Sequence, residues 1–444
     1  MIQIIQVQPD SSYFKLKFLS GGRLLALTTP KKYISYRFLY LFGIGLILLG
    51  FAFDSPERIF TGMIEILHSP SNLLTDYFAL AGVGATFFNS GLITLISIFM
   101  VQRMNLSING AICAGIMTVA GFSFFGKDLF NSIPIMAGCL LYAKYTRVPP
   151  RSVVLAMLFG TSLAPVVSFI AFGMDLPLAL GVPLGSLVGI MVGFIIPPTS
   201  TLFLSFHQGF NLYNFGFTAG IIAMALVGVL RMFGIDVDTK KDLYLGDDTQ
   251  FKIILILFFI FLIVVGFLKN GKSFKGYGSL LKESGRLAAD FVSQFNDGLV
   301  FINMGLCGFI CLIYVFVSDG VINGPVIGGI FTVLAFSAFG KHPRNIIPTL
   351  TGIFIANHFS IHELNSTSAI VSGLFGTCIA PLAGYYGWPF GIAAGFIHTA
   401  MVNNIGFLHG GLNLYNNGFS GGFVAAILVP VFDLIVKPRQ ERTL

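Results

Sequence analysis

The chain has 444 residues, of which 55% are hydrophobic and only 10% are charged. A soluble protein of this length needs many more charged residues to cover its surface, so this composition excludes the soluble classes. A net charge of +7 would suggest nucleic-acid binding in a soluble protein. In a membrane protein it is typical of cytoplasmic loops and contact with anionic lipid, so we expect membrane lipid and no nucleic acid among the partners.

The N-terminal segment does not have the pattern of a cleaved signal peptide. Residues 1–32 mix polar and apolar side chains, carry five lysines and arginines, and contain no compact apolar core. The five cysteines all fall in apolar segments without metal-ligand spacing, so we interpret them as packing residues. Phosphate-binding loops, zinc-protease motifs and nucleophile elbows are absent from the sequence. It therefore predicts no metal, no cofactor and no enzymatic activity.

Apolar runs long enough to cross a bilayer recur along the chain and predict an all-α polytopic membrane protein. Two short polar stretches, 199–214 and 408–418, predict re-entrant loops. About fourteen membrane segments are expected, at residues 33–53, 78–101, 108–126, 131–145, 151–172, 177–197, 215–233, 251–268, 290–316, 322–340, 346–360, 366–384, 387–407 and 419–436.

Three blocks of sequence occur twice in the same order. Residues 207–223 and 409–425 share ten of seventeen positions, including an Asn-Leu-Tyr-Asn core that we call the NLYN loop. Residues 108–127 and 322–341 share twelve of twenty positions. LFGTSLAP at 158–165 returns as LFGTCIAP at 374–381, and Asn89 and Gly91 correspond to Asn303 and Gly305. Collinear matches of this kind indicate an internal duplication.

The distribution of positive charge predicts the direction of the two copies. With all fourteen segments crossing and the N-terminus inside, 20 of the 26 lysines and arginines are cytoplasmic. Seven crossings then separate the copies, so the repeats are inverted, as in many transporters. We expect a multi-pass protein of the plasma membrane with both termini cytoplasmic. The predicted divisions are an N-terminal segment with the first helix (1–58), a first repeat (59–233), an external acidic loop with a linker helix (234–274), a second repeat (275–436) and a tail (437–444).

The two NLYN loops are the first candidate site. Inverted loops approach from opposite faces, and their amide and hydroxyl groups would then surround a small polar solute near the midplane. Helix capping by asparagine is the alternative interpretation. The candidate solute-binding residues of the two loops are His207, Asn211, Tyr213, Asn214, His409, Asn413, Tyr415 and Asn416.

Broken helices are the second candidate feature. Gly and Pro flank Thr161 and Thr377 in the two FGT motifs, a pattern that is typical either of a discontinuous transport helix or of a plain proline kink. We include both threonines in the candidate solute site. Asn109 and Asn323 stand where a helix is expected to begin, and we interpret them as N-caps.

Four ionisable residues in apolar surroundings are candidates for proton or ion coupling. Asp76 and Asp290 are duplicated, whereas Asp297 and His398 occur only in the second copy. A carboxylate or imidazole at membrane depth is costly, which makes function the default hypothesis, although a structural role is compatible with the same pattern. Packing of helices is the expected role of the small-residue spacings at Gly181, Gly185 and Gly189 and at Gly391 and Gly395.

With its duplicated halves and NLYN motif, the chain resembles an uncharacterised bacterial family of integral membrane proteins. A more distant likeness is to the urea transporters, whose halves open a helix with a Gly-Leu-x-Gly-(Tyr/Phe)-Asn stretch. Gly209, Tyr213 and Asn214 match that stretch in the first copy, as do Gly411, Tyr415 and Asn416 in the second. Leu212 and Leu414 depart from it, because they stand where that family has its second glycine. The likeness implies a solute channel or transporter.

The sequence therefore supports two functional hypotheses. The first is a channel or transporter for a small polar solute with a midplane site between the NLYN loops. The second is a membrane-embedded enzyme or lipid-handling protein that uses Asp297 and His398 as acid and base, which requires the two side chains within hydrogen-bond reach. Either hypothesis is compatible with a homo-oligomer.

Overall fold

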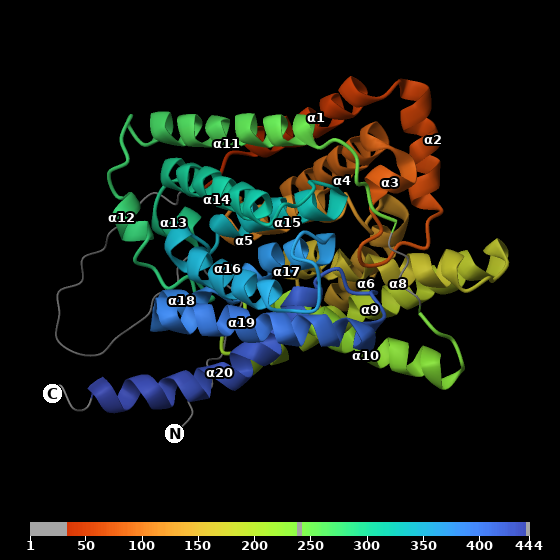
Figure 1. Ribbon diagram of the computed structural model, residues 1–444. Helices are drawn as coiled ribbons and strands as arrows, with labels where there is room; N and C mark the ends of the chain where they lie inside the picture. Colours follow the sequence, from red (N-terminus) through yellow and green to blue (C-terminus); the bar gives the residue numbers. More distant parts are fainter. Residues whose placement is uncertain (1–32, 238–241, 441–444) are drawn as a thin grey trace. The chain divides into compact units, whose positions relative to one another are not determined.

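A computed structural model describes residues 33–237 and 242–440, and within them the regular elements are helices (Figure 1). The first half contains α1 (Tyr36–Phe53), α2 (Pro56–Leu67), α3 (Tyr77–Ala81), α4 (Val83–Arg103), α5 (Gly110–Phe122), α6 (Leu129–Tyr145), η1 (Pro150–Val153), α7 (Val154–Gly160), η2 (Thr161–Leu163), α8 (Ala164–Ser168), η3 (Phe169–Gly173), α9 (Leu178–Phe206) and α10 (Asn214–Met232). The second half contains α11 (Thr249–Lys269), α12 (Tyr277–Leu280), α13 (Phe291–Gln294), α14 (Asp297–Val317), α15 (Gly324–Ser337), α16 (Pro343–His358), α17 (Thr367–Gly376), η4 (Thr377–Ile379), α18 (Ala380–Tyr386), α19 (Trp388–Ile405), η5 (Gly406–His409) and α20 (Asn416–Gln440).

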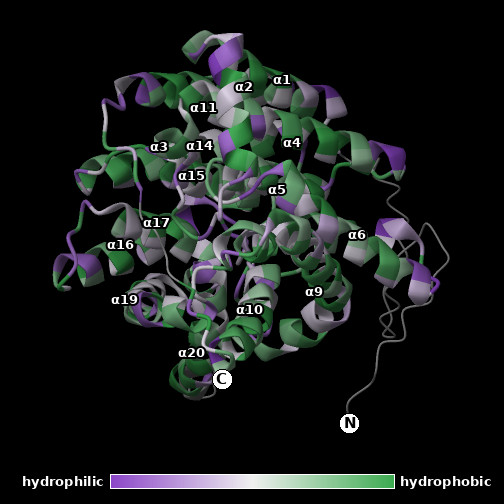
Figure 2. Ribbon diagram, turned by 90° about the vertical axis from the view of Figure 1, so that its right-hand side faces the viewer, coloured by the Kyte–Doolittle hydropathy of each residue, from purple (hydrophilic) through white to green (hydrophobic). Residues whose placement is uncertain are grey.

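Ten helical stretches in the described part of the chain are long and apolar enough to cross a membrane. Hydrophobic residues cover most of these helices in Figure 2. In α1 and α11 fewer than a third of the residues are buried inside the protein, although both helices are strongly apolar. Large exposed apolar side chains such as Leu41 and Leu257 lie on them. An apolar surface of this extent fits a lipid environment, so the chain is a polytopic helical membrane protein.

Helices lie in each of the fourteen predicted apolar segments, but only ten helical stretches of the described residues are long and apolar enough to cross a membrane, so fourteen membrane segments are not shown. α2 lies outside the predicted segments, and two boundaries also differ. Residues 199–206 belong to α9, which ends at Phe206. The first predicted re-entrant loop, 199–214, is therefore shorter than expected. α20 extends to Gln440, and the first four residues of the predicted tail are therefore helical. Three parts of the chain lie outside the described residues: 1–32, 238–241 and 441–444. The first of them is the segment whose pattern differs from that of a signal peptide.

Side-chain caps start the short central helices where the sequence predicted. Asn109 accepts a hydrogen bond from Ile112 N at 2.9 Å, and Asn323 accepts one from Val326 N at 3.2 Å. These caps satisfy backbone donors that the first turn of a helix leaves without partners. At 13 and 14 residues, α5 and α15 are among the shorter apolar helices and are not counted among the ten candidate spans.

The two halves hold each other through these short helices. Asp76 of the first half accepts from Gly324 N at the start of α15, at 3.2 Å. Asp290 of the second half accepts from Gly110 N at the start of α5, at 3.0 Å. A Cβ atom at Gly110 would meet Ala338 O, just beyond the end of α15. The start of one helix therefore lies at the end of the other, and α5 and α15 are antiparallel.

The correspondence between the halves reaches beyond the predicted repeats. α1 packs on α4 as α11 packs on α14. Gly91 of α4 closely approaches Gly43 O of α1, and Gly305 of α14 approaches Phe259 O of α11 in the same way. In Figure 1, α1 leads into α2 at one side and α11 leads into α12 at the other, so the two helices run in opposite directions.

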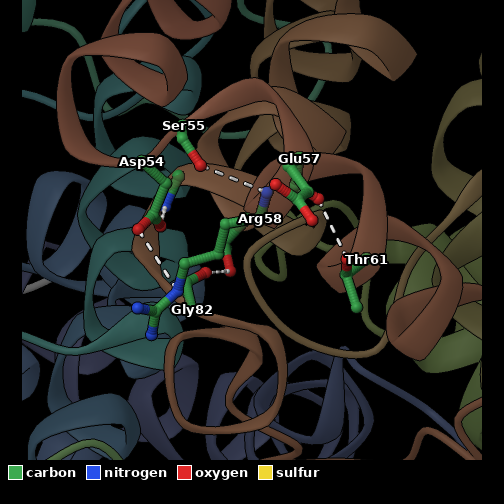
Figure 3. Close-up of polar contacts among 8 residues, drawn as sticks. Asp54, Ser55, Glu57, Arg58, Thr61 and Gly82 are labelled. Atoms are coloured by element: carbon green, nitrogen blue, oxygen red, sulfur yellow. Dashed lines mark hydrogen bonds and ion pairs between the residues drawn. The ribbon is translucent and has the colours of Figure 1, made fainter.

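The segment after α1 distinguishes the first half from the second. The Ser55 hydroxyl caps α2, the Arg58 guanidinium pairs with Asp54 at 3.4 Å, and the Thr61 hydroxyl donates to Glu57 O at 2.9 Å (Figure 3). The other carboxylate oxygen of Asp54 accepts from Gly84 N at 2.7 Å. This polar cluster therefore attaches the start of α2 to the start of α4.

Glycine spacing brings other helices into close contact, as predicted. A Cβ atom at Gly185 would lie 2.7 Å from Val167 O, and one at Gly395 would lie 2.2 Å from Thr349 O. Separations this short leave no room for any side chain at these positions. The small-residue spacings in α9 and α19 therefore serve helix packing.

Candidate functional site

The two NLYN loops meet at the junction of the halves. The Asn211 amide donates to Gly418 O at 2.8 Å, and the Asn413 amide donates to Gly216 O at 3.1 Å. The rings of Tyr213 and Tyr415 lie between these contacts, with centroids 4.8 Å apart. α10 and α20 leave this junction toward opposite sides in Figure 1. Each asparagine therefore binds the first turn of the helix that follows the NLYN loop of the opposite half.

Each loop also pairs with the helix break of the opposite half. Leu212 N donates to Cys378 O at 2.9 Å, and Leu414 N donates to Ser162 O at 3.0 Å. These carbonyls are available because η2 and η4 interrupt the regular helices that precede α8 and α18. A 3-10 turn thus interrupts the α-helix at each FGT motif, as both alternatives allow, and the carbonyls that it frees bind protein backbone.

Two buried lysines, which the sequence analysis did not identify as candidates, occupy corresponding positions. The Lys127 ammonium donates to the Thr161 hydroxyl at 2.7 Å, and the Lys341 ammonium donates to the Thr377 hydroxyl at 2.7 Å. Both lysines are at most 1% exposed. None of the four ion pairs among the described residues includes either of them. Each lysine thus depends on neutral oxygen atoms and aromatic rings, an expensive arrangement for a charged group.

The duplicated asparagines of α4 and α14 hold the lysine backbones. The Asn89 amide donates to Lys127 O at 2.9 Å, and the Asn303 amide donates to Lys341 O at 2.7 Å. The threonine hydroxyls give their own protons to carbonyls three residues earlier, Leu158 O and Leu374 O. Their lone pairs therefore face the ammonium groups, which orients both lysines toward the junction.

The two lysines differ in one contact. The Lys341 ammonium also donates to the Tyr213 hydroxyl at 2.6 Å and lies 4.5 Å from the centre of that ring. The corresponding tyrosine of the other half, Tyr415, is buried, and its hydroxyl has no hydrogen-bond partner among the described residues. Both lysines share a second ring contact, because the Lys127 ammonium lies 5.3 Å from the centre of the Phe122 ring and the Lys341 ammonium lies 5.4 Å from that of its counterpart, Phe336. The symmetry of the junction is therefore broken at the tyrosine hydroxyls.

A polar cavity of about 920 Å³ adjoins the second NLYN loop. Leu414 and Asn416 of that loop line its inner end. Its outer end carries both signs of charge, because Arg231, Asp236 and Glu363 line it there. The further polar lining residues are Asn357, His362, Ser366, Ser368, Ser372, Asn403 and Asn417.

A smaller cavity of about 230 Å³ lies against the first NLYN loop. Leu212 and Asn214 line it, in correspondence with the two residues of the second loop that line the larger cavity. Its other lining residues are almost all apolar: Ala111, Leu155, Phe159, Leu204, Tyr213, Phe215, Gly216, Leu287, Ala288, Phe336, Phe339 and Tyr415. The junction thus has a large polar cavity next to one loop and a small apolar cavity next to the other.

The second asparagine of each loop binds within its own half. Asn214 pairs with His207 at 3.0 Å and donates to Ser200 O at 2.9 Å. Asn416 pairs with His409 at 2.8 Å, and its amide lies 3.5 Å from Val402 O. Both histidines are buried. These contacts secure the end of the preceding helix, so the amides are not directed jointly into one central volume.

The duplicated aspartates bind backbone at the ends of helices. Besides Gly324 N, Asp76 accepts from Phe78 N and Tyr244 N, each at 2.9 Å. Asp76 lies outside the ten candidate spans, and burial raises its pKa to about 6 against the lowering effect of these backbone donors. Asp290 accepts from Val292 N and Ser293 N in addition to Gly110 N. The geometry of both residues is that of helix caps.

Asp297 and His398 lie in separate surroundings. Asp297 begins α14 and pairs with Lys269 at the end of α11, and both side chains are partly exposed. His398 is buried within α19, where it pairs with Asn417 at 2.9 Å. Each residue has its own partner, so the acid–base pair required by the enzyme hypothesis gains no support from these contacts. The described residues contain no group of three His, Cys, Asp or Glu side chains suited to a metal ion.

In a comparison with protein-family models, residues 55–232 and 269–434 of the chain match one family model. The chain belongs to this family, which is described as "Protein of unknown function (DUF1576)". The two regions correspond to the duplicated halves. No curated protein and no solved structure matches the chain, and the comparisons do not show the likeness to urea transporters.

Proposed function

We propose that this member of the DUF1576 family is a channel or transporter for a small polar solute. The observation that carries the proposal is the meeting of both NLYN loops and both broken helices at a junction beside a polar cavity of about 920 Å³. Broken helices and irregular backbone at membrane depth are typical of solute pathways. On this proposal the protein is not an enzyme, and the loops are re-entrant segments, of which the second lines the solute cavity.

The arrangement of the halves is the second part of the proposal. The antiparallel course of α5 and α15, and the opposite course of α1 and α11, support an inverted repeat across the plasma membrane. Both termini are then cytoplasmic. Counting Lys127 and Lys341 as buried changes the predicted distribution of positive charge from 20 inside and 6 outside to 19 (20 − 1) and 5 (6 − 1), so the bias persists.

Labelling of an introduced cysteine tests this topology. Asp242 is exposed in the acidic loop, whereas the five native cysteines are buried, so Asp242→Cys provides a single accessible thiol. We expect a membrane-impermeant maleimide to label it in intact cells. Labelling only after permeabilisation would contradict the external position of this loop. Unmodified protein provides the background.

Uptake into proteoliposomes tests the function. A panel of labelled urea, glycerol, glycolamide and glycolate is supplied, and at least one solute should enter about tenfold faster than into protein-free liposomes. Ser368 is exposed and lines the polar cavity, and its counterpart in the first half, Ser152, is exposed and does not line that cavity. We expect Ser368→Trp to reduce uptake several-fold and Ser152→Trp to leave it unchanged. Equal effects of the two variants, or no uptake of any solute, would contradict the proposal.

A further inference from the structure

The surroundings of Lys127 contain buried polar atoms that lack partners. Nine buried side-chain atoms of the described residues have no hydrogen-bond partner, and three of them are the hydroxyls of Thr118, Ser162 and Tyr415. Ser162 follows Thr161, whose hydroxyl accepts from the lysine. Buried hydroxyls without partners are rare in proteins, so these three require an explanation.

Ring contacts link two of these hydroxyls, those of Tyr415 and Thr118, to the lysine. The Tyr415 ring lies 4.5 Å from the ring of Phe122, and the Lys127 ammonium lies over the latter ring. Thr118 is one helical turn before Phe122 on α5, and its hydroxyl lies beside that of Tyr415. The Phe122 ring thus links the Lys127 ammonium to the neighbouring hydroxyls of Tyr415 and Thr118, and all three groups can donate hydrogen bonds.

We propose that this region, the Lys127 site, binds the carboxylate group of a small organic anion. The inference rests on the proposed transport function and names the chemical class of its solute. A bound carboxylate supplies the negative charge that Lys127 lacks and accepts hydrogen bonds from the hydroxyls. Its single charge balances one ammonium group, whereas a dianion such as sulfate would keep an unbalanced charge in buried surroundings. The aromatic rings provide an apolar wall for the organic part of the solute.

The polar cavity ends beside the residue that precedes Lys127. Leu414 lines the inner end of the cavity, and its side chain packs directly on Gly126, the residue before Lys127. A movement of Leu414 would therefore connect the cavity to the lysine. In the other half, the Tyr213 hydroxyl accepts a hydrogen bond from the Lys341 ammonium. The Lys341 region is thus the same site in a closed form.

Paired probes of equal size test the proposal. Glycolate and glycolamide have similar dimensions and differ in charge, so their uptake by proteoliposomes separates recognition of a carboxylate from general passage of polar solutes. We expect glycolate uptake at pH 7.5 to exceed glycolamide uptake at least fivefold. Lys127→Met should lower glycolate uptake about tenfold or more, and Lys127→Arg should restore part of it because the charge is retained.

A second variant covers the case in which Lys127→Met does not fold. Tyr415→Phe removes a hydroxyl whose polar neighbour is the Thr118 hydroxyl, so the folded yield should change little while glycolate uptake falls several-fold. Tyr213→Phe is the matched change in the other half. Undiminished glycolate uptake by Tyr415→Phe, or chloride conducted as well as glycolate, would overturn the carboxylate site. Uptake of glycolamide, urea or glycerol without uptake of glycolate would also overturn it, but would leave the transport function standing.

Discussion

The regions around Lys127 and Lys341 share a backbone frame and differ in a single tyrosine contact. In both, an asparagine of the preceding long helix holds the lysine carbonyl and a threonine at a helix break accepts from the ammonium. Only Lys341 is bound by a tyrosine hydroxyl. The duplication thus preserves the positions of the charges, while the contacts of the hydroxyl groups distinguish one half from the other.

The cavities beside the two NLYN loops also differ between the halves, in volume and in the polarity of their lining. The polar cavity of about 920 Å³ lies beside the second loop, and the apolar cavity of about 230 Å³ lies beside the first. Under the proposed function, this difference corresponds to a protein open toward one side of the membrane and closed toward the other. Exchange of the two arrangements between the halves would provide alternating access. The following variants test whether corresponding residues are equivalent.

The largest expected effect concerns the aspartates that join the halves. Asp76 is fully buried and Asp290 is partly exposed, although each accepts three backbone hydrogen bonds. Replacing a buried acceptor by alanine leaves buried donors without partners, whereas partly exposed donors regain water. We expect Asp76→Ala to lower the free energy of unfolding by about 3 kcal/mol and Asp290→Ala by about 1 kcal/mol. Unfolding in detergent measures both, and equal losses would show that burial does not distinguish them.

A smaller effect follows from the titration of Asp76. Its pKa is about 6 in the folded protein, above the ordinary value of 3.8, so the folded state binds the proton more tightly than the unfolded state. Stability should therefore increase as the pH falls from about 6 toward 3.8, and this gain is absent above the folded pKa. We expect a contribution of about 1–3 kcal/mol. Asp76→Asn is the control, because it removes the titration. A wild-type protein whose pH dependence matches that variant would contradict the prediction.

The positions of the helices could be predicted from the sequence because apolar length and capping are local properties. Asn109 and Asn323 precede their helices directly, and their caps formed as predicted. Lys127 and Lys341 were counted as loop charges, because each is followed by a polar residue and lies at the end of an apolar run. The available signal was their identity in both copies. Their burial depends on the folding of distant helix breaks around them, which no local pattern encodes.

The asparagines at the ends of the NLYN loops give the smallest expected effect and the finest comparison. Sequence reasoning treated Asn214 and Asn416 as equivalent parts of one site, but each binds a histidine of its own half. Asn416 also lines the polar cavity, whereas Asn214 lines the apolar one. Asn214→Leu should therefore lower stability by about 1 kcal/mol and leave uptake per folded molecule intact.

Asn416→Leu should cost less stability, because its second amide contact is long at 3.5 Å, but it places an apolar group at the inner end of the polar cavity. Solute that passes through this cavity would lose a hydrogen-bonding surface, so uptake per folded molecule should fall several-fold. Uptake normalised to the folded protein, measured for both variants in the same liposomes, separates the two effects. If both variants retain full normalised uptake, the solute does not depend on the second loop, and the difference between the cavities has no part in transport.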